Sequence, residues 1–306
     1  MKRLLLVYNP NSSQYIHVKD EILSRATKVR GYMVGKFTIK KAPFRKNVAA
    51  LADFLKDGDT VVAAGGDATA AVCVNAILES GKDVVLGVLP YGNFNDLART
   101  LGTMRYEDIF PLGSSKVRKL YPLDIKVDGK HWRYASCYVT MGMTAEAVEL
   151  FDEPKFRKKM QRGHRSSWRS CLALVKWFFR FRHSHQFIPP YHINGVASPR
   201  GVSDYWALSG RSMCRVMKGG DDFLRPTFFR SGSRNLTGFW SITFLMLQSI
   251  FARTPGEETS GDSIVFDEPA TIKLQAEGEY ETFHDVHELT VTKPTSKSIK
   301  VFHKGA

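Results

Sequence analysis

Cysteine is scarce in this sequence, and the few cysteines lie far apart. The chain has 306 residues, of which four are cysteine, and no two of them form a Cys-x-x-Cys pair. Structural zinc sites and disulfide frameworks both depend on closely spaced or paired cysteines. We therefore expect neither in this protein, and the composition fits a reducing, cytoplasmic environment.

Long apolar runs are also missing. No stretch approaches 18 consecutive apolar residues, so the sequence predicts no membrane-spanning helix. The apolar run at residues 4–8 ends at an Asn-Pro pair and is too short for the apolar part of a signal peptide, so we predict a β-strand there. No motif recurs with a period of 20–50 residues.

Acidic residues are outnumbered by basic ones. The chain carries 44 Lys and Arg against 30 Asp and Glu, a formal net charge of +14. Eleven of the basic residues lie between Lys155 and Arg200, where there is no Asp or Glu. This excess favours an anionic partner, whether nucleic acid, a phospholipid surface or a phosphorylated substrate. Because no nucleic-acid recognition motif accompanies the charge, we expect no nucleic-acid partner.

The basic stretch also contains a helical apolar period. In "SSWRSCLALVKWFFRFR" (166–182), the apolar residues fall on one helical face, and a stripe of cations lies beside it. This pattern is typical of a helix that lies on an anionic membrane surface. It is equally typical of a helix that packs on its own domain and exposes a basic flank, and both interpretations stay open.

The first hundred residues repeat one rhythm of a short β-branched run, a turn and a helical period. Strands that alternate with helices of 10–15 residues indicate βαβ units and a parallel sheet. Ligands of such sheets bind outside the carboxyl ends of the strands. We predict strands over 3–8, 33–40, 60–64 and 84–89, and helices over 16–29, 45–56, 68–79 and 94–102.

The pattern changes after residue 118. Two strands flank Asp128-Gly129, which is a hairpin signal, and turn-rich short strands continue from 186 to 302. The expected fold is an α/β N-terminal domain with a parallel sheet, then a larger antiparallel, β-sandwich-like domain with a helical insertion, and a cleft between the two. The expected limits are 1–118 for the first domain, 119–291 for the second and 144–182 for the insertion, with the tail 292–306 returning to the first domain.

A double-glycine turn follows the third predicted strand, in "VVAAGGDATAAV" (61–72). Glycines let the backbone approach a ligand closely, and the next helix offers free N–H groups that bind phosphate. Thr69 can cap the helix or donate its hydroxyl. Asp67 would need a Mg²⁺ ion or a substrate hydroxyl beside it. The alternative is an ordinary βα turn with Asp67 exposed on the surface.

Two further predicted strands end in polar turns. "YNPNSS" (8–13) follows the first strand, and "VVLGVLPYGNFNDLART" (84–100) repeats the plan of strand, turn and helix. Asn93 and Asn95 can cap that helix, and Asp96 lies in its first turn. Three such strand ends are expected to cluster along one edge of the sheet.

The segments "NPNSS", "GGDAT", "LPYGNFNDLAR" and "EGEYE" resemble, in order and spacing, those of the diacylglycerol kinase-like lipid kinases. This superfamily includes bacterial diacylglycerol kinases and sphingosine kinases. The resemblance covers nearly the whole chain. It implies an enzyme that uses ATP and Mg²⁺ to phosphorylate a lipid hydroxyl, with ATP in a cleft between the two domains.

The resemblance also implies roles for individual residues. Glu279 matches the proposed general base of the family, and Asp67 is expected to take part in catalysis. A hairpin-turn acid is the alternative for Glu279. No metal ligands are assigned. The residues that match nucleotide-binding positions are Asn9, Asn11, Ser12, Thr38, Gly65, Gly66, Asp67, Ala68, Thr69 and Asn93.

The sequence departs from the family pattern at several positions. Ala68 replaces a glycine, which costs free energy only if the backbone there needs a positive φ. The other changed positions are Val72, Phe94, Thr144, Thr237 and Glu277. These changes keep two alternatives open, a catalytically degenerate protein that binds nucleotide or lipid and, less favoured, a soluble-substrate kinase like the NAD kinases.

The expected partner is a lipid substrate at an anionic membrane surface. The protein is accordingly expected to be cytoplasmic and peripheral at the inner membrane surface. A homodimer is left open, and so is the identity of the lipid, because every lipid alcohol needs the same phosphate machinery.

Overall fold

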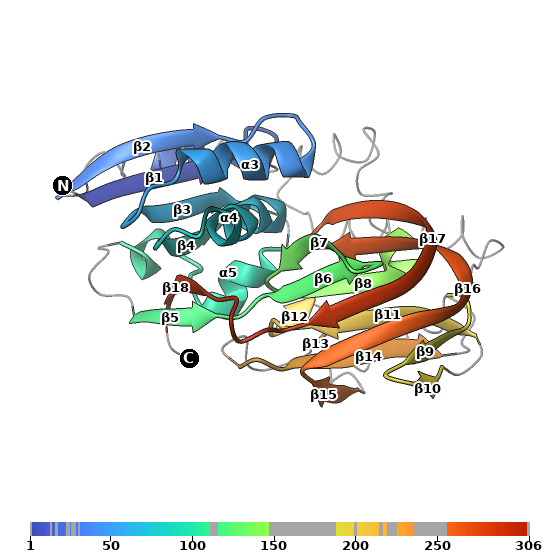
Figure 1. The fold of residues 1–306 in the computed structure, drawn as a ribbon. Coiled ribbons are helices and arrows are strands. Elements are labelled where there is room, and N and C mark those ends of the chain that lie inside the picture. The colour runs from blue at the N-terminus through green and yellow to red at the C-terminus, as the bar shows by residue number, and fades with distance from the viewer. Residues whose placement is uncertain are drawn as a thin grey trace. The chain divides into compact units, whose positions relative to one another are not determined.

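The structure is a computed structural model, and its chain divides into two compact units (Figure 1). Unit 1 comprises Met1–Pro122, Phe223–Arg225 and Thr295–Ala306, and unit 2 comprises Leu123–Asp222 and Pro226–Pro294. The residues that the structure describes are 2–12, 14–15, 18–22, 25, 29, 31–92, 94–110, 116–146, 188–198, 201–213, 217–218, 225–234 and 256–304.

Unit 1 is built around a six-stranded sheet. Its strands are β1 (Lys2–Tyr8), β2 (Tyr32–Thr38), β3 (Thr60–Gly65), β4 (Val85–Pro90), β5 (Lys116–Leu120) and β18 (Ile299–His303). They lie in the order β2-β1-β3-β4-β18-β5, and all run parallel except β5, which is antiparallel to β18. The predicted parallel sheet is thus confirmed. Strand β18, which lies between β4 and β5, comes from the C-terminal end of the chain.

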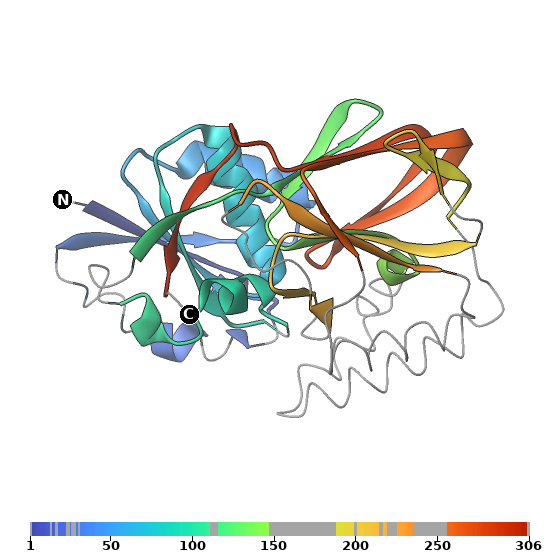
Figure 2. The ribbon, with the colours of Figure 1, turned by 90° about the horizontal axis from the view of Figure 1, so that it is seen from below.

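The helices of unit 1 pack on both faces of this sheet. Helices α3 (Phe44–Phe54) and α4 (Asp67–Ser80) lie on one face, and the shorter α5 (Asp96–Leu101) lies on the other (Figure 2). The predicted helices over 45–56, 68–79 and 94–102 are confirmed apart from small differences at their ends. Of the predicted helix 16–29, the structure describes one π-helical turn, η1 (Val18–Ile22), and part of the segment lies outside the described residues. A 3₁₀ turn, η2 (Tyr106–Asp108), follows α5.

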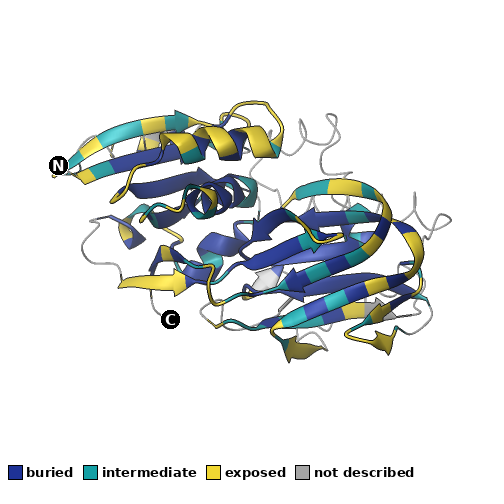
Figure 3. Cartoon of the chain, in the orientation of Figure 1, coloured by how far each residue is buried: buried dark blue, intermediate teal, exposed yellow. Residues whose placement is uncertain are grey.

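The core of unit 1 explains why its central strands β1, β3 and β4 show continuous rather than alternating apolar character. All six residues of β3, Thr-Val-Val-Ala-Ala-Gly, are buried (Figure 3). A central parallel strand is covered by helices on both faces, so each side chain meets apolar surface. Small residues dominate the buried part of α4, including Ala70, Ala71 and Ala76. They let this helix approach the sheet and its strand-end loops closely.

Unit 2 is one antiparallel ten-stranded sheet with a small two-stranded sheet beside it. The main sheet follows the order β15-β14-β11-β8-β16-β17-β6-β7, with β9 paired to β16 and β10 to β9. The predicted larger antiparallel β domain is confirmed, as one curled sheet. The bounds are β6 (Leu123–Val127), β7 (Lys130–Ala135), β8 (Tyr138–Gly142), β9 (Tyr191–Ile193), β10 (Val196–Ala197), β11 (Val202–Leu208), β12 (Ser212–Met213), β13 (Met217–Lys218), β14 (Phe228–Arg234), β15 (Glu257–Thr259), β16 (Gly261–Ala276) and β17 (Glu279–Thr292).

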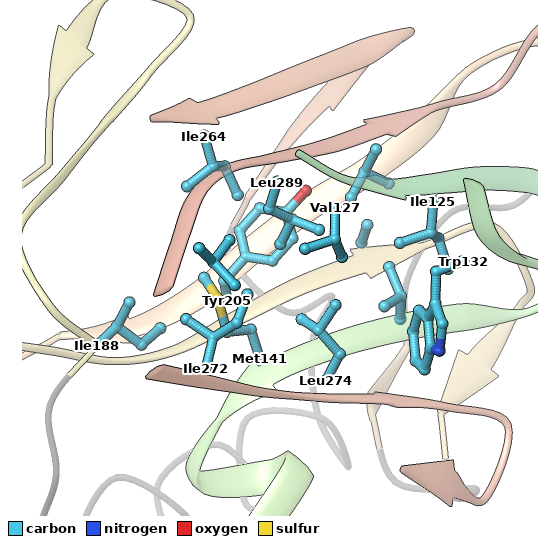
Figure 4. Packing of buried hydrophobic residues seen from close by; sticks show 14 of the residues in the cluster. Ile125, Val127, Trp132, Met141, Ile188, Tyr205, Ile264, Ile272, Leu274 and Leu289 are labelled. Carbon is cyan, nitrogen blue, oxygen red and sulfur yellow. The ribbon is translucent and has the colours of Figure 1, made fainter. Parts of the chain in front are cut away.

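Local sequence accounts for the turns of this sheet. The predicted hairpin at Asp128-Gly129 joins β6 to β7, and both turn residues have a positive φ, of 47° and 72°. A two-residue turn of this kind matches the right-handed twist of the strands. Register shifts in the long β16–β17 hairpin bend both strands. The bend lets one face of the sheet enclose an apolar core that includes Ile125, Met141, Leu274 and Leu289 (Figure 4).

Two sequence predictions fall where the structure is not described. The helical insertion over 144–182 lies outside the described residues from 147 onward, and the basic apolar stretch at 166–182 lies wholly outside them. None of the described helices is long and apolar enough to cross a membrane.

Candidate active site

The candidate phosphate site is the turn between β3 and α4. Gly66 precedes the helix in an extended conformation, with φ −90° and ψ −172°, and no side chain caps the helix start. The first N–H groups of a helix have no partner within the helix, and the helix dipole places partial positive charge there. The sequence Gly65-Gly66-Asp67 therefore ends a buried strand with a set of N–H groups suited to a phosphate.

Close backbone contact explains the glycines. A Cβ on Gly65 would lie 2.3 Å from the Thr69 hydroxyl oxygen, because that buried side chain packs over the turn. A Cβ on Gly92 would lie 2.3 Å from the Cα of Gly66. The loop after β3 and the loop after β4 thus touch backbone to backbone. Gly92 was not among the predicted site residues, although the sequence pattern of strand, glycine and Asn pointed to this loop.

Ala68 carries no backbone strain. It is the second residue of α4, and it is absent from the described residues with a positive φ. The condition under which alanine would be costly at this position is therefore not met. The change from glycine to alanine places one methyl group at the helix start and leaves the backbone of the turn intact.

Asn95 has a different role from the predicted helix cap. Its Oδ1 accepts a hydrogen bond from the Gly92 N–H at 2.7 Å, and its Nδ2 donates to the Gly92 carbonyl at 2.8 Å. The residue precedes α5 in the left-handed region, with φ 56°, and makes no side-chain cap. Its side chain therefore fixes the loop after β4. Asn93 lies outside the described residues.

Asp67 holds the start of α5. Its Oδ1 accepts a hydrogen bond from the Leu97 N–H at 3.2 Å, although Asp67 itself belongs to the first turn of α4. The pKa of Asp67 is raised to about 7, chiefly by burial and also by the nearby Asp96 carboxylate, while backbone N–H groups at the start of α5 oppose the shift. The alternative of a freely exposed surface acid is wrong. This carboxylate connects two strand-end loops.

The loop after β1 joins the same edge of the sheet. Asn9 Oδ1 accepts a hydrogen bond from the Asn11 N–H at 2.9 Å, and the Ser12 N–H donates to the Asn9 carbonyl at 3.0 Å. The Ser12 hydroxyl oxygen is buried and has no hydrogen-bond partner among the described residues. Gln14 Nε2 lies 3.4 Å from the Gly92 carbonyl, which brings this loop to the loop after β4.

Thr38 ends β2 at the level of the other strand ends, because it is paired with Tyr8. Its side chain is exposed. The predicted nucleotide residues in the described part of the chain thus lie along one edge of the unit 1 sheet. Their nucleotide contacts remain a prediction.

Glu279, the predicted general base, is the first residue of β17 in unit 2. It is paired with Ala276 across a two-residue turn formed by Glu277 and Gly278, whose φ values are 53° and 90°. Its side chain is half-buried. The turn itself matches the hairpin anticipated for "AEGEYE", and the catalytic role of Glu279 remains a prediction.

Other altered family positions have structural partners. The Thr144 N–H and hydroxyl both donate to Asp204 Oδ1 at 2.7 Å, and Trp206 Nε1 donates to the Thr144 hydroxyl at 3.0 Å. Val72 is buried within α4. Thr237 lies outside the described residues. Within the described part of the chain, no group of three or more His, Cys, Asp or Glu side chains is arranged to hold a metal ion.

A comparison with protein families matches the part of the chain that contains these loops. Residues 3–117, which contain all three strand-end loops, match the model of the diacylglycerol kinase catalytic domain. This part of the chain is similar to the diacylglycerol kinase-like lipid kinases. The matched region does not include Glu279, so the match bears on the loops of unit 1 and not on the acid of unit 2.

Curated relatives match only part of this chain. A diacylglycerol kinase of Bacillus subtilis (strain 168) is 33% identical over 136 residues, which is 43% of this chain and 44% of the relative. A diacylglycerol kinase of Staphylococcus epidermidis is 33% identical over 105 residues, which is 33% of this chain and 32% of the relative. The chain thus spans less than half the length of these relatives.

Solved structures extend the likeness to the whole fold. A structure described as a diacylglycerol kinase from Bacillus anthracis str. Sterne has a TM-score of 0.65 to this chain, at 15% identity. The match covers 99% of this chain and 97% of the chain in that structure. At that identity the likeness shows the fold alone. It supports a parallel-sheet unit combined with a larger antiparallel curled sheet.

Proposed function

We propose that this diacylglycerol kinase-like protein is a lipid kinase that transfers the γ-phosphate of ATP to a hydroxyl group of a membrane lipid. The observation that carries the proposal is the Gly65-Gly66 turn, which places an uncapped helix start at the carboxyl end of a buried strand. The Gly92 loop packs against this turn, and Asp67 fixes it to α5. These contacts hold the turn within unit 1 by interactions of the protein alone.

The chemistry of phosphoryl transfer suits such a turn. The reaction depends on positioning and on neutralising the charge of the transferred group, rather than on covalent chemistry by the protein. In the proposal, the N–H groups at the start of α4 bind phosphate oxygens, and the Ser12 hydroxyl offers a further donor. Mg²⁺ that arrives with ATP would neutralise phosphate oxygens, and we assign it no protein ligands.

Glu279 is the proposed acceptor of the lipid hydroxyl proton. A carboxylate serves as a general base when it lies within hydrogen-bond reach of the proton it removes. We expect the substitution Glu279→Gln to abolish transfer from ATP to lipid and to leave ATP binding near normal, because glutamine keeps the size of the side chain but cannot take the proton. The measurement is transfer of labelled γ-phosphate from ATP and Mg²⁺ to a panel of lipid alcohols in anionic vesicles.

The control for that experiment is Glu281→Gln. Glu281 is an exposed acid on the same strand and face, and its Oε2 accepts a hydrogen bond from Trp132 Nε1. We expect Glu281→Gln to retain transfer of phosphate from ATP to lipid. Unchanged turnover in Glu279→Gln would remove Glu279 from the mechanism.

The proposal also places the protein at the cytoplasmic face of an anionic membrane. Its basis is the net charge of +14 and the attraction of about 1 kcal/mol per Lys or Arg near an anionic surface. We expect the protein to sediment with anionic vesicles at low salt and to dissociate as salt is raised, because salt screens exposed charges. Neutral phosphatidylcholine vesicles are the control. Equal binding to neutral vesicles would contradict a charge-driven contact.

A second candidate is a degenerate member that binds nucleotide or lipid without transferring phosphate. The buried Val72 favours it, because no carboxylate stands at a helix position where the resemblance leads us to expect one. The same labelling experiment separates the two candidates. ATP binding without transfer to any lipid alcohol would support the degenerate protein.

A further inference from the structure

The turn that precedes Glu279 is anchored by a buried carboxylate. Glu277 is only 2% exposed, although it occupies a hairpin turn, where side chains usually reach solvent. Its Oε1 accepts hydrogen bonds from the Ser136 N–H at 2.8 Å, from the Cys137 N–H at 2.7 Å and from the Ser136 hydroxyl. One oxygen of the β16–β17 turn therefore binds the whole β7–β8 turn.

The anchor continues to a third strand end. The Cys137 carbonyl accepts hydrogen bonds from the Ser209 N–H at 2.7 Å and the Gly210 N–H at 2.9 Å, directly after β11. Strands β11, β8, β16 and β17 are consecutive neighbours in the sheet. Glu277 thus links the ends of these strands across the edge at which Glu279 begins its strand.

The conformation of this turn is costly. A Cβ on Gly278 would meet no atom within 4 Å, so the outer side of the turn lies in open space. Glu277 also adopts a φ of 53°, which L-residues other than Asn and Asp rarely tolerate and which costs about 1–2 kcal/mol. Burial of a carboxylate adds a further cost, which the hydrogen bonds from Ser136 and Cys137 offset. An Asn-Gly turn would avoid both costs but would not reach Ser136.

We propose that Glu277 is a positioning residue that fixes the Glu279 carboxylate through its bonds to the β7–β8 turn. This proposal rests on the proposed function, in which Glu279 accepts the proton of the lipid hydroxyl. Glu277 acts as a hydrogen-bond acceptor and neither gives nor takes a proton in the reaction. A displacement of about 1 Å at a reacting group costs as much as about 100-fold in rate, so a loosened turn should slow transfer strongly.

Two substitutions at this residue separate the possible roles. Glu277→Asn creates the most favoured residue pair for such a turn, so the hairpin should form, but the shorter side chain loses Ser136 and Cys137. Glu277→Gln keeps the length and an oxygen acceptor and loses the charge. We expect kcat to fall by about tenfold or more in Glu277→Asn, with the KM for ATP little changed, and to stay within about threefold of wild type in Glu277→Gln.

A control variant tests for loss of stability alone. Thr140→Val breaks the bond from the Thr140 hydroxyl to Gln275 Oε1, 2.8 Å long and buried between β8 and β16. It should lower the melting temperature and leave kcat unchanged. The proposal is overturned if Thr140→Val lowers kcat as much as Glu277→Asn does, or if Glu277→Asn keeps the wild-type kcat. It is also overturned if Glu277→Gln is as slow as Glu277→Asn, since a proton-transfer role would then be indicated.

Backbone amide exchange tests the anchor without any activity. Opening of a local segment speeds the exchange of its amides, so we expect Gly278, Glu279 and Tyr280 to exchange about tenfold faster in Glu277→Asn and at wild-type rates in Thr140→Val. Unchanged exchange in Glu277→Asn would overturn the anchor. A folded wild-type protein that phosphorylates no lipid alcohol would instead overturn the proposed function, and the exchange result would still decide whether Glu277 fixes this turn.

Discussion

At the scale of single residues, two carboxylates in the turns of the candidate site form hydrogen bonds within the protein. Asp67 accepts a hydrogen bond from the start of α5, and Glu277 binds the β7–β8 turn. A carboxylate that accepts backbone N–H groups is held in one orientation. The acid of a glycine turn can therefore preserve the shape of a phosphate site without contacting phosphate.

The raised pKa of Asp67 predicts a dependence of stability on pH. The folded protein holds this proton up to about pH 7, whereas an unfolded chain releases it near pH 4, so the folded state binds more protons between these values. Its contribution to stability is therefore fully present below about pH 4 and is lost as pH rises to about 7. Asp67→Asn keeps an oxygen for the Leu97 N–H and removes the titration.

We expect the unfolding free energy of Asp67→Asn to rise relative to wild type across this window, by at most about 1.4 kcal/mol per pH unit. Urea unfolding of both proteins at several pH values between 4 and 8 measures the difference. A difference that does not change with pH would show that Asp67 titrates in the folded protein as it does in the unfolded chain.

At the scale of elements, the strands and helices of unit 1 follow from local sequence, whereas the contacts between its loops do not. Apolar runs and helical periods placed β1, β3, β4, α3 and α4 within a few residues. Asn95 looked like a helix cap because Asn is favoured before a helix. Its bonds to Gly92 arise because the loop after β4 folds back against Gly66, and sequence periodicity does not report such a contact.

The contact between the two glycine loops can be tested by Gly92→Ala. The new Cβ would lie 2.3 Å from Gly66 Cα, so the loops must separate, and we expect a loss of about 1–3 kcal/mol in unfolding free energy and weaker ATP binding. Chemical denaturation and calorimetric titration with ATP measure the two effects. Gly35→Ala is the matched control, since its Cβ would come no closer than 3.4 Å to Leu5. Equal effects of the two substitutions would contradict the contact.

At the scale of the whole molecule, the end of the chain completes the sheet of unit 1. Strand β18 lies between β4 and β5, and its side chains Ile299, Val301 and Phe302 are at most 4% exposed. Burial of each such side chain contributes about 1.5–3 kcal/mol, and a typical domain is stable by only about 5–15 kcal/mol. Unit 1 therefore depends on a strand that is made about 180 residues after β5.

Removal of residues 295–306 should unfold unit 1. We expect a chain that ends at Pro294 to show rapid proteolysis within residues 1–122, because β5 loses its neighbour and β4 becomes an edge. A chain that ends at Lys304 keeps all of β18 and serves as the control. Limited proteolysis with mass spectrometry reads out the cleaved sites, and resistance of the shorter chain would show that β18 is dispensable.

The amino-acid sequence by itself determined the class of each unit, the strand-end loops and the resemblance to a kinase family, because these depend on periodicity and on short motifs read along the chain. It offered a hairpin-turn acid as the alternative for Glu279, which the structure places directly after a two-residue hairpin turn. Only the tertiary structure decided which side chains meet, namely Asp67 with α5, Gly92 with Gly66, and Glu277 with Ser136 across 141 residues. Such contacts depend on how separate strands end beside one another, and no local preference encodes them.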